Sequence, residues 1–274
     1  TYRNGSAAAF DSEFVSRFGS RNAYADLGDA HVIPLNSCRL QPEFNDWRNV
    51  RAEVCADDLT WLETTLAGLI PNRPLLVFVH IPLATTYPER RSADRDTTDV
   101  WRVTNADEVL ARLATWSGPV IIGQGHLHEN EHLHRHGMHL VSLGAVCGRW
   151  WQHGEQTRCT DNSPRGWLVA DVAQEAVHLE FRAARAPASW QGEITTKGGE
   201  RWLNLFFGDP AETVEILCNG EWIELPAATP IAVDDTFFSV HHWLLPTACR
   251  ADAIEVRTRL RDQPWNVGRV HQAE

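Results

Sequence analysis

The chain has 274 residues, of which 43% are hydrophobic and 22% charged, a balance typical of a globular protein with one large or two modest domains. Its formal net charge is −11 at pH 7, which argues against nucleic-acid binding through a broad basic surface but leaves phosphate-containing substrates open. The sequence has no apolar run of the roughly 18 residues that a membrane-spanning helix needs.

The first residue is Thr1 rather than a methionine, so we expect the natural protein to begin further upstream. The lack of a leader in these residues therefore leaves the compartment open, with the periplasm or the exterior favoured over the cytoplasm. Six cysteines are scattered without a CxxC pair, which disfavours a cysteine zinc site. Three disulfides and six free thiols are both compatible with this number, and nothing in the sequence indicates the oligomeric state.

The first part of the chain alternates strand-like and helix-like segments. A buried strand is predicted over residues 30–37, and an amphipathic helix over residues 57–69 with Asp57 as its N-cap. The apolar run 75–79 predicts a central strand that ends at His80.

The same alternation continues toward the middle of the chain. A second helix is predicted over residues 104–116, where Thr104 and Asp107 resemble a capping box. Buried strands follow over residues 119–124 and 138–145. This order implies an α/β sheet with helices on its faces, and such sheets carry their chemistry at the carboxyl ends of the strands.

After a closing hairpin over residues 167–183, the helical patterns disappear. Residues 186–199 are interpreted as a connector, and the turn signal Asn219-Gly220 lies between two of the short strand-like runs that follow. These runs cover residues 202–207, 213–218, 221–225, 236–245 and 253–260. We therefore expect an α/β domain over residues 1–185 and a small all-β, sandwich-like domain over residues 186–274.

Histidines follow two of the predicted strands. Gly125-His126-Leu127-His128 comes after one strand, and His80 after another. Imidazole is a good ligand for Zn, Fe and Mn. By itself, the Gly125 to His128 motif is equally compatible with two surface histidines, and a single histidine such as His80 is more often structural than a ligand. Neighbouring parallel strands, however, bring their carboxyl ends together. The proximity of the two strand ends favours a metal site formed by His80, His126 and His128.

The two histidine motifs belong to a series of six short segments. These are Leu35-Asn36-Ser37, Trp61-Leu62-Glu63, Val77 to Leu83, Gly125 to His128, Gly144 to Trp151 and Ser163 to Trp167. Their order resembles the calcineurin-like metallophosphoesterase superfamily, most closely its bacterial branch with an extra C-terminal β domain. The resemblance spans about residues 20–185, and the later strands are similar to that extra domain more loosely. The resemblance implies the carboxy-terminal part of an α/β sandwich, and the hydrolysis of phosphomonoesters or phosphodiesters by metal-bound hydroxide.

The resemblance also implies a ligand set. His80 matches the fourth motif of the family and His126 the first histidine of the fifth motif, so these two should share one of two divalent or trivalent ions (Mn, Fe or Zn). His128 should bind the other ion. The first three motifs of the family, DxH, GDxxD and GNH(D/E), are not found ahead of His80, and we expect them to lie before Thr1.

The missing motifs would supply the bridging carboxylate and the remaining catalytic groups. No catalytic residue beyond the metal ligands is implied within this chain. Without the bridging carboxylate the two ions would be held only in part, so we expect the chain as given to be inactive or nearly so. A different class of function is a non-catalytic binding module in which the β domain recognises a partner or a glycan.

Other polar and aromatic residues are candidates for substrate contacts. Arg90 and Arg91 could bind a substrate phosphate, although the favoured interpretation is that they lie in a solvated loop without contact to substrate. Trp150 and Trp151 could stack on a substrate ring, and packing against the sheet is the alternative. The segment 129–139 contains four further histidines, for which a hydrated ribbon is favoured over an accessory metal site.

Overall fold

A computed structural model describes residues 7–40, 50–91, 100–149, 158–173, 176–234, 237–260 and 266–272. Up to residue 183 its helices are α1 (Ala7–Phe18), α2 (Ala56–Gly68), α3 (Tyr87–Arg90) and α4 (Ala106–Leu113). The strands of this part are β1 (Ala25–Asp26), β2 (His31–Pro34), β3 (Arg39–Leu40), β4 (Val50–Arg51), β5 (Leu75–Val79), β6 (Val120–Gln124), β7 (Glu131–Arg135), β8 (Met138–Ser142), β9 (Gly166–Ala173) and β10 (Ala176–Ala183). The predicted order of strand, helix, strand, helix and strand corresponds to β2, α2, β5, α4 and β6, whereas α1 was not predicted.

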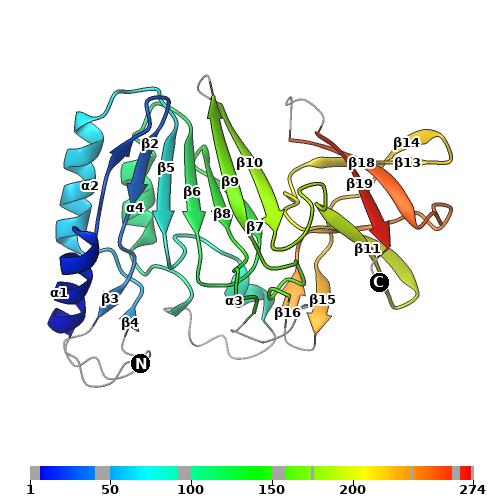
Figure 1. Cartoon of the computed structure of the whole chain (residues 1–274), viewed down its shortest axis with the longest axis horizontal. Helices are drawn as coiled ribbons and strands as arrows, with labels where there is room; N and C mark the ends of the chain where they lie inside the picture. Colours follow the sequence, from blue (N-terminus) through cyan, green and yellow to red (C-terminus); the bar gives the residue numbers. More distant parts are fainter. Residues whose placement is uncertain are drawn as a thin grey trace.

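A six-stranded sheet organises this α/β part (Figure 1). Its strand order is β1-β2-β5-β6-β8-β7, with β2, β5, β6 and β8 parallel and the two edge strands antiparallel. The central pair runs in register from Leu75 opposite Val120 to Val79 opposite Gln124. The carboxyl ends of β5 and β6 therefore lie side by side at one edge of the sheet.

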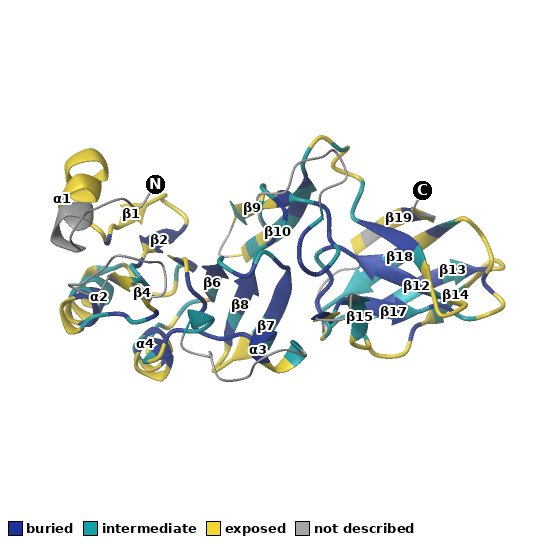
Figure 2. Cartoon of the chain, turned by 90° about the horizontal axis from the view of Figure 1, so that it is seen from below, coloured by how far each residue is buried: buried dark blue, intermediate teal, exposed yellow. Residues whose placement is uncertain are grey.

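Helices α2 and α4 cover one face of this sheet. Leu62 of α2 and Leu113 of α4 are fully buried in the same core cluster as Val77 and Ile122. Each such side chain contributes about 1.5–3 kcal/mol through burial. Figure 2 shows the β9–β10 hairpin on the opposite side of the sheet from these helices. The predicted α/β class is confirmed, because the apolar stripes of both helices pack against the central strands.

The remaining strands form the predicted all-β part. They are β11 (Gly192–Lys197), β12 (Glu200–Leu205), β13 (Thr213–Cys218), β14 (Glu221–Glu224), β15 (Ile231–Asp234), β16 (Phe237–Ser239), β17 (His242–Leu244), β18 (Ala253–Arg259) and β19 (Asn266–Gln272). Seven of them join in the order β14-β13-β18-β19-β11-β12-β17, and β15 pairs with β16 alone. One core cluster, which includes Ile194, Ile216 and Trp243, draws on strands across the whole sheet. The all-β class is therefore confirmed.

Several local predictions were wrong. Helix α2 has Cys55 at its N-cap, so Asp57 lies in the first turn instead. Thr104 does not cap α4, because its hydroxyl donates to the Ala52 carbonyl at 3.0 Å. Asn105 takes the N-cap position, and its amide binds the backbone of the Val54 segment rather than its own helix. These side chains fix α4 to the preceding loop.

The interpretation of residues 186–199 as a connector was also wrong in part, since β11 occupies residues 192–197. The strand predicted over residues 236–245 is divided into β16 and β17. Phe181 of β10 packs with Phe206, which follows β12, so the two parts share a buried apolar contact. The boundary between residues 185 and 186 stays a prediction.

The structure records all six cysteines as free thiols. Three of them, Cys159, Cys218 and Cys249, are buried. None of the described helices combines the length and hydropathy needed to cross a bilayer.

Candidate metal centre

The ends of β5 and β6 bring two of the predicted ligands together. His80 follows β5 directly, and His126 lies two residues after β6. Their ring centroids are 5.1 Å apart with the planes at 71°. The Gly125 amide donates to the His80 carbonyl at 3.0 Å, which holds the two strand ends together beyond the sheet. The parallel pairing predicted from two apolar runs therefore positions both imidazoles at one edge.

His80, His126 and His128 all line one cavity of about 320 Å³. Residues 78–79, 123–125 and 143–145 complete its wall. The structure thus brings together the three histidines that the sequence singled out. Their role as metal ligands stays a prediction.

The loop that carries His126 and His128 has a strained backbone. Both residues lie in the left-handed region, with φ of 72° and 56°. This conformation is uncommon for residues other than glycine, and it persists only where the surrounding structure enforces it. Thr160 supplies part of that support, because its amide donates to the His128 carbonyl at 2.8 Å and its hydroxyl to the Leu127 carbonyl at 3.2 Å. Such enforced strain is typical of functional sites.

Hydrogen bonds to carbonyl groups fix the ring orientation of two of the histidines. His126 Nε2 donates to the Val100 carbonyl at 2.8 Å, so Nδ1 carries the lone pair. His128 Nδ1 lies 2.8 Å from the Gly148 carbonyl and 2.7 Å from the Arg149 carbonyl, so Nε2 carries the lone pair. Metal-ligating histidines usually donate their second nitrogen in this way.

The electrostatics of the cavity favour neutral imidazoles. Burial lowers the pKa of His80, and the nearby His128 adds to this shift. Burial, followed by the proximity of His80, lowers the pKa of His126 to about 4. The neutral rings of His80 and His126 have lone pairs available at pH 7, and imidazole ligands suit a transition-metal ion such as Zn, Fe or Mn. Among the described residues no carboxylate lines the cavity, so a bridging ligand for a second ion is not among them.

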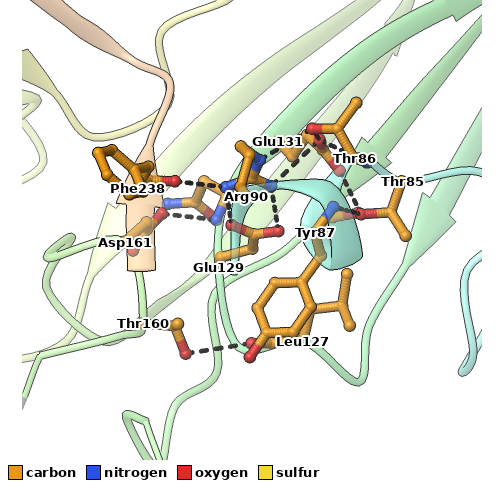
Figure 3. Close-up of polar contacts among 12 residues, drawn as sticks. Thr85, Thr86, Tyr87, Arg90, Leu127, Glu129, Glu131, Thr160, Asp161 and Phe238 are labelled. Carbon is orange, nitrogen blue, oxygen red and sulfur yellow. Dashed lines mark hydrogen bonds and ion pairs between the residues drawn. The ribbon is translucent and has the colours of Figure 1, made fainter. Parts of the chain in front are cut away.

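Arg90 lies in a buried ion-pair network (Figure 3). This network lies behind the loop that carries His126 and His128, which we call the histidine loop. Its guanidinium donates to both oxygens of Glu129, at 2.8 and 2.6 Å, and to Glu131 at 3.2 Å. It also donates to the Phe238 carbonyl at 2.8 Å, while its side chain is only 9% exposed. Because Glu129 directly follows His128, the ion pair anchors the loop to α3. These contacts give Arg90 a structural role, and its predicted substrate contact stays a prediction.

The other predicted substrate contacts lie partly outside the described residues. Arg91 stacks on the rings of Tyr87 and Trp101, at 5.4 and 4.9 Å from their centroids. The Trp101 ring is 5.7 Å from that of His126, so Arg91 is one aromatic ring away from the candidate centre. Trp150 and Trp151 fall outside the described residues.

Sequence reasoning missed the polar residues that support the loop from behind. Asn130 accepts a hydrogen bond from the Gly144 amide at 2.7 Å and donates to the Phe206 carbonyl at 2.6 Å. Asp161 accepts from the Asn130 amide at 2.6 Å and from His241 at 3.0 Å, and all of these groups are buried. Single polar residues in loops carry no periodic signal, so only the family segments around residues 144–151 and 163–167 pointed to this region.

Comparison with known proteins gives a family for part of the chain. Residues 141–260 match the family model described as the C terminal of calcineurin-like phosphoesterase. The match covers less than half of the chain and begins in β8, after the histidine loop. The comparison with curated proteins gave no match.

Among solved structures, a dimetal phosphatase from Danio rerio aligns with a TM-score of 0.44 and 13% identity. The alignment covers 66% of this chain and 66% of that chain, just under two thirds of each. The bacterial branch of the superfamily stays a prediction. The family match supports the calcineurin-like superfamily, because residues 141–260 are similar to the C-terminal region of its members.

Proposed function

We propose that this chain is the metal-binding carboxy-terminal portion of a hydrolase that acts on phosphomonoesters or phosphodiesters. The observation that carries the proposal is the convergence of His80, His126 and His128 on one cavity at the ends of β5 and β6. The family match to the C terminal of calcineurin-like phosphoesterase supports the same reaction class.

His80 and His126 would hold one metal ion, and His128 would contribute to a second. When bound, such ions supply positive charge against the phosphate and a nucleophile that is available at neutral pH. The residues of this chain orient the ligands. Val100 holds the ring of His126, and the carbonyl groups at residues 148–149 hold the ring of His128.

We further propose that residues 1–274 alone hydrolyse phosphate esters slowly or not at all. Their sequence lacks the DxH, GDxxD and GNH(D/E) motifs, and no carboxylate lines the cavity among the described residues. Two ions held without a bridging carboxylate have little to keep them at the separation of roughly 3.5–4 Å that two-metal catalysis uses.

The first experiment measures phosphate-ester hydrolysis with and without added metal ions. With Mn²⁺ or Zn²⁺ added, we expect p-nitrophenyl phosphate turnover below about 1 s⁻¹, the low end for enzymes. Any metal-dependent turnover should disappear in the His80→Ala, His126→Ala double variant. The control is His178→Ala, because that histidine lies exposed in β10, and it should behave as the parent chain does.

Two results would contradict these proposals separately. If the double variant retains metal-dependent turnover, His80 and His126 do not hold the metal ion that hydrolysis requires. Turnover well above 1 s⁻¹ by the parent chain would leave the site in place but contradict the proposed need for the absent motifs.

A further inference from the structure

A second cluster of ligand-type side chains lies on the β7–β8 hairpin, away from the first cavity. His132 Nδ1 and His139 Nε2 are 2.9 Å apart, and each lies 3.9 Å from Asp209 Oδ2. Within the part of the chain that the structure describes, this is the only group of three such side chains whose ligand atoms all lie within 4.8 Å of one another. The group shares no residue with the first site.

The fold explains why these residues meet. Residues directly opposite in an antiparallel pair share a face, and so do residues two apart in a strand. His139 of β8 lies opposite His134, so His132, His134 and His139 share one face of the hairpin. Asp209 reaches that face from the turn that follows β12. The cluster therefore joins the α/β part to the all-β part.

Asp209 is held in a fixed orientation. Its Oδ1 accepts a hydrogen bond from the Ala211 amide at 2.9 Å, and its Oδ2 accepts one from His134 Nε2 at 2.6 Å. Its side chain is 6% exposed, and that of His132 is 5% exposed. The sequence favoured a hydrated ribbon for this histidine-rich segment, and for His132 that interpretation was wrong, because Phe207 covers its ring at 4.2 Å between centroids.

The distances suit a common ion. Zinc binds imidazole nitrogen at about 2.0–2.1 Å, so two donors of a tetrahedral site lie about 3.4 Å apart. The observed separations of 2.9 and 3.9 Å bracket that value.

We propose that His132, His139 and Asp209 bind one transition-metal ion of the zinc class, and that His134 is a positioning residue for Asp209. Two imidazoles and one carboxylate are a donor set that zinc uses, with a fourth position for water. The ion fastens the β7–β8 hairpin to the turn after β12, so we expect it to stabilise the contact between the two parts of the chain.

The test removes the first site so that the second can be measured alone. The parent for this test is the 274-residue chain with His80→Ala and His126→Ala, treated with a chelator that is then removed. In titration calorimetry we expect one equivalent of Zn²⁺ to bind, and Zn²⁺ to raise the Tm by mass action. Co²⁺ should give the visible absorption of a protein-bound ion.

Variants of the cluster are then added one at a time to this parent. His139→Gln and Asp209→Asn should each weaken Zn²⁺ binding at least about 10-fold and abolish the rise in Tm. The substitution Asp209→Asn keeps an oxygen for the Ala211 amide, so the fold should survive, and circular dichroism checks it. The matched control is His136→Gln, because His136 is exposed in the turn of the same hairpin. This control should bind Zn²⁺ as the parent does.

Two outcomes would overturn the proposal. One is a parent chain with native circular dichroism that binds no Zn²⁺. The other is Zn²⁺ binding that neither His139→Gln nor Asp209→Asn weakens. Since the first site is absent from every protein in this test, the result does not depend on the proposed phosphoesterase function.

Discussion

At the scale of single residues, the histidine loop depends on charges that are buried behind it. Arg90 faces Glu129 and Glu131, whose side chains are 0% and 2% exposed. A buried charge that loses its partner is far more costly than an intact pair is stabilising. The strained conformations of His126 and His128 are therefore tied to an ion pair at the next residue along the chain.

Replacing Arg90 should show this dependence directly. We expect Arg90→Met to lower the free energy of unfolding by about 3–5 kcal/mol, because it leaves two buried carboxylates without a cation. Adding Glu129→Gln to that variant should restore part of the loss. Urea unfolding measures both changes. Arg250→Met is the control, since Arg250 is exposed, and it should change stability by less than about 0.5 kcal/mol. Equal effects of the two arginine replacements would refute the assignment of Arg90 as an anchor.

At the scale of elements, the best-predicted segments were those whose pattern is local. The apolar run 75–79 coincides with β5, and the strand predicted over residues 119–124 corresponds to β6 at residues 120–124. The strand β11 was missed because Ile194 is the only large apolar residue in it, so no alternation marks it. It forms because β12 and β19 pair with it, which is information that the local sequence does not contain.

The same distinction between local and distant information separates the two clusters of candidate metal ligands. The positions of His80 and His126 followed from two strand ends, a local feature. The burial of His132 and its approach to Asp209 depend on a turn that lies more than seventy residues further along the chain. Histidine spacing alone could not distinguish a hydrated ribbon from a ligand cluster, because that distinction rests on what packs against the hairpin.

The β13–β14 turn offers a test at the element scale. Asn219 and Gly220 have φ of 53° and 89°, as a two-residue hairpin turn with both central residues left-handed requires. We expect Gly220→Ala to destabilise the fold by about 1 kcal/mol or more, because alanine is strained there. Gly68→Ala at the end of α2 should instead stabilise by up to about 1 kcal/mol, since a Cβ there meets nothing within 4 Å. Urea unfolding should give opposite signs for the two variants, and equal signs would contradict the turn assignment.

At the scale of the whole molecule, one buried histidine near the contact between the two parts makes the fold sensitive to acid. His241 donates to Asp161 at 3.0 Å across the contact between the parts, and His242 stacks beside it at 5.2 Å between ring centroids. Burial, then the proximity of His241, lowers the pKa of His242 to about 3. The unfolded chain binds a proton at this ring below about pH 6.5, and the folded chain does not.

The sign of the effect follows from that difference. Because the folded pKa is depressed, stability is retained above pH 6.5 and is lost as the pH falls from about 6.5 toward 3. Because of this one ring, the free energy of unfolding should be about 2 kcal/mol lower at pH 5 than at pH 7.5. Urea unfolding gives the free energy of unfolding at pH 7.5 and at pH 5. The loss of this free energy between the two pH values should be smaller by about 2 kcal/mol in His242→Gln than in the parent chain. His178→Gln, at an exposed position in β10, should leave the difference unchanged. If His242→Gln and the parent lose the same stability between the two pH values, acid acts on this fold through other groups.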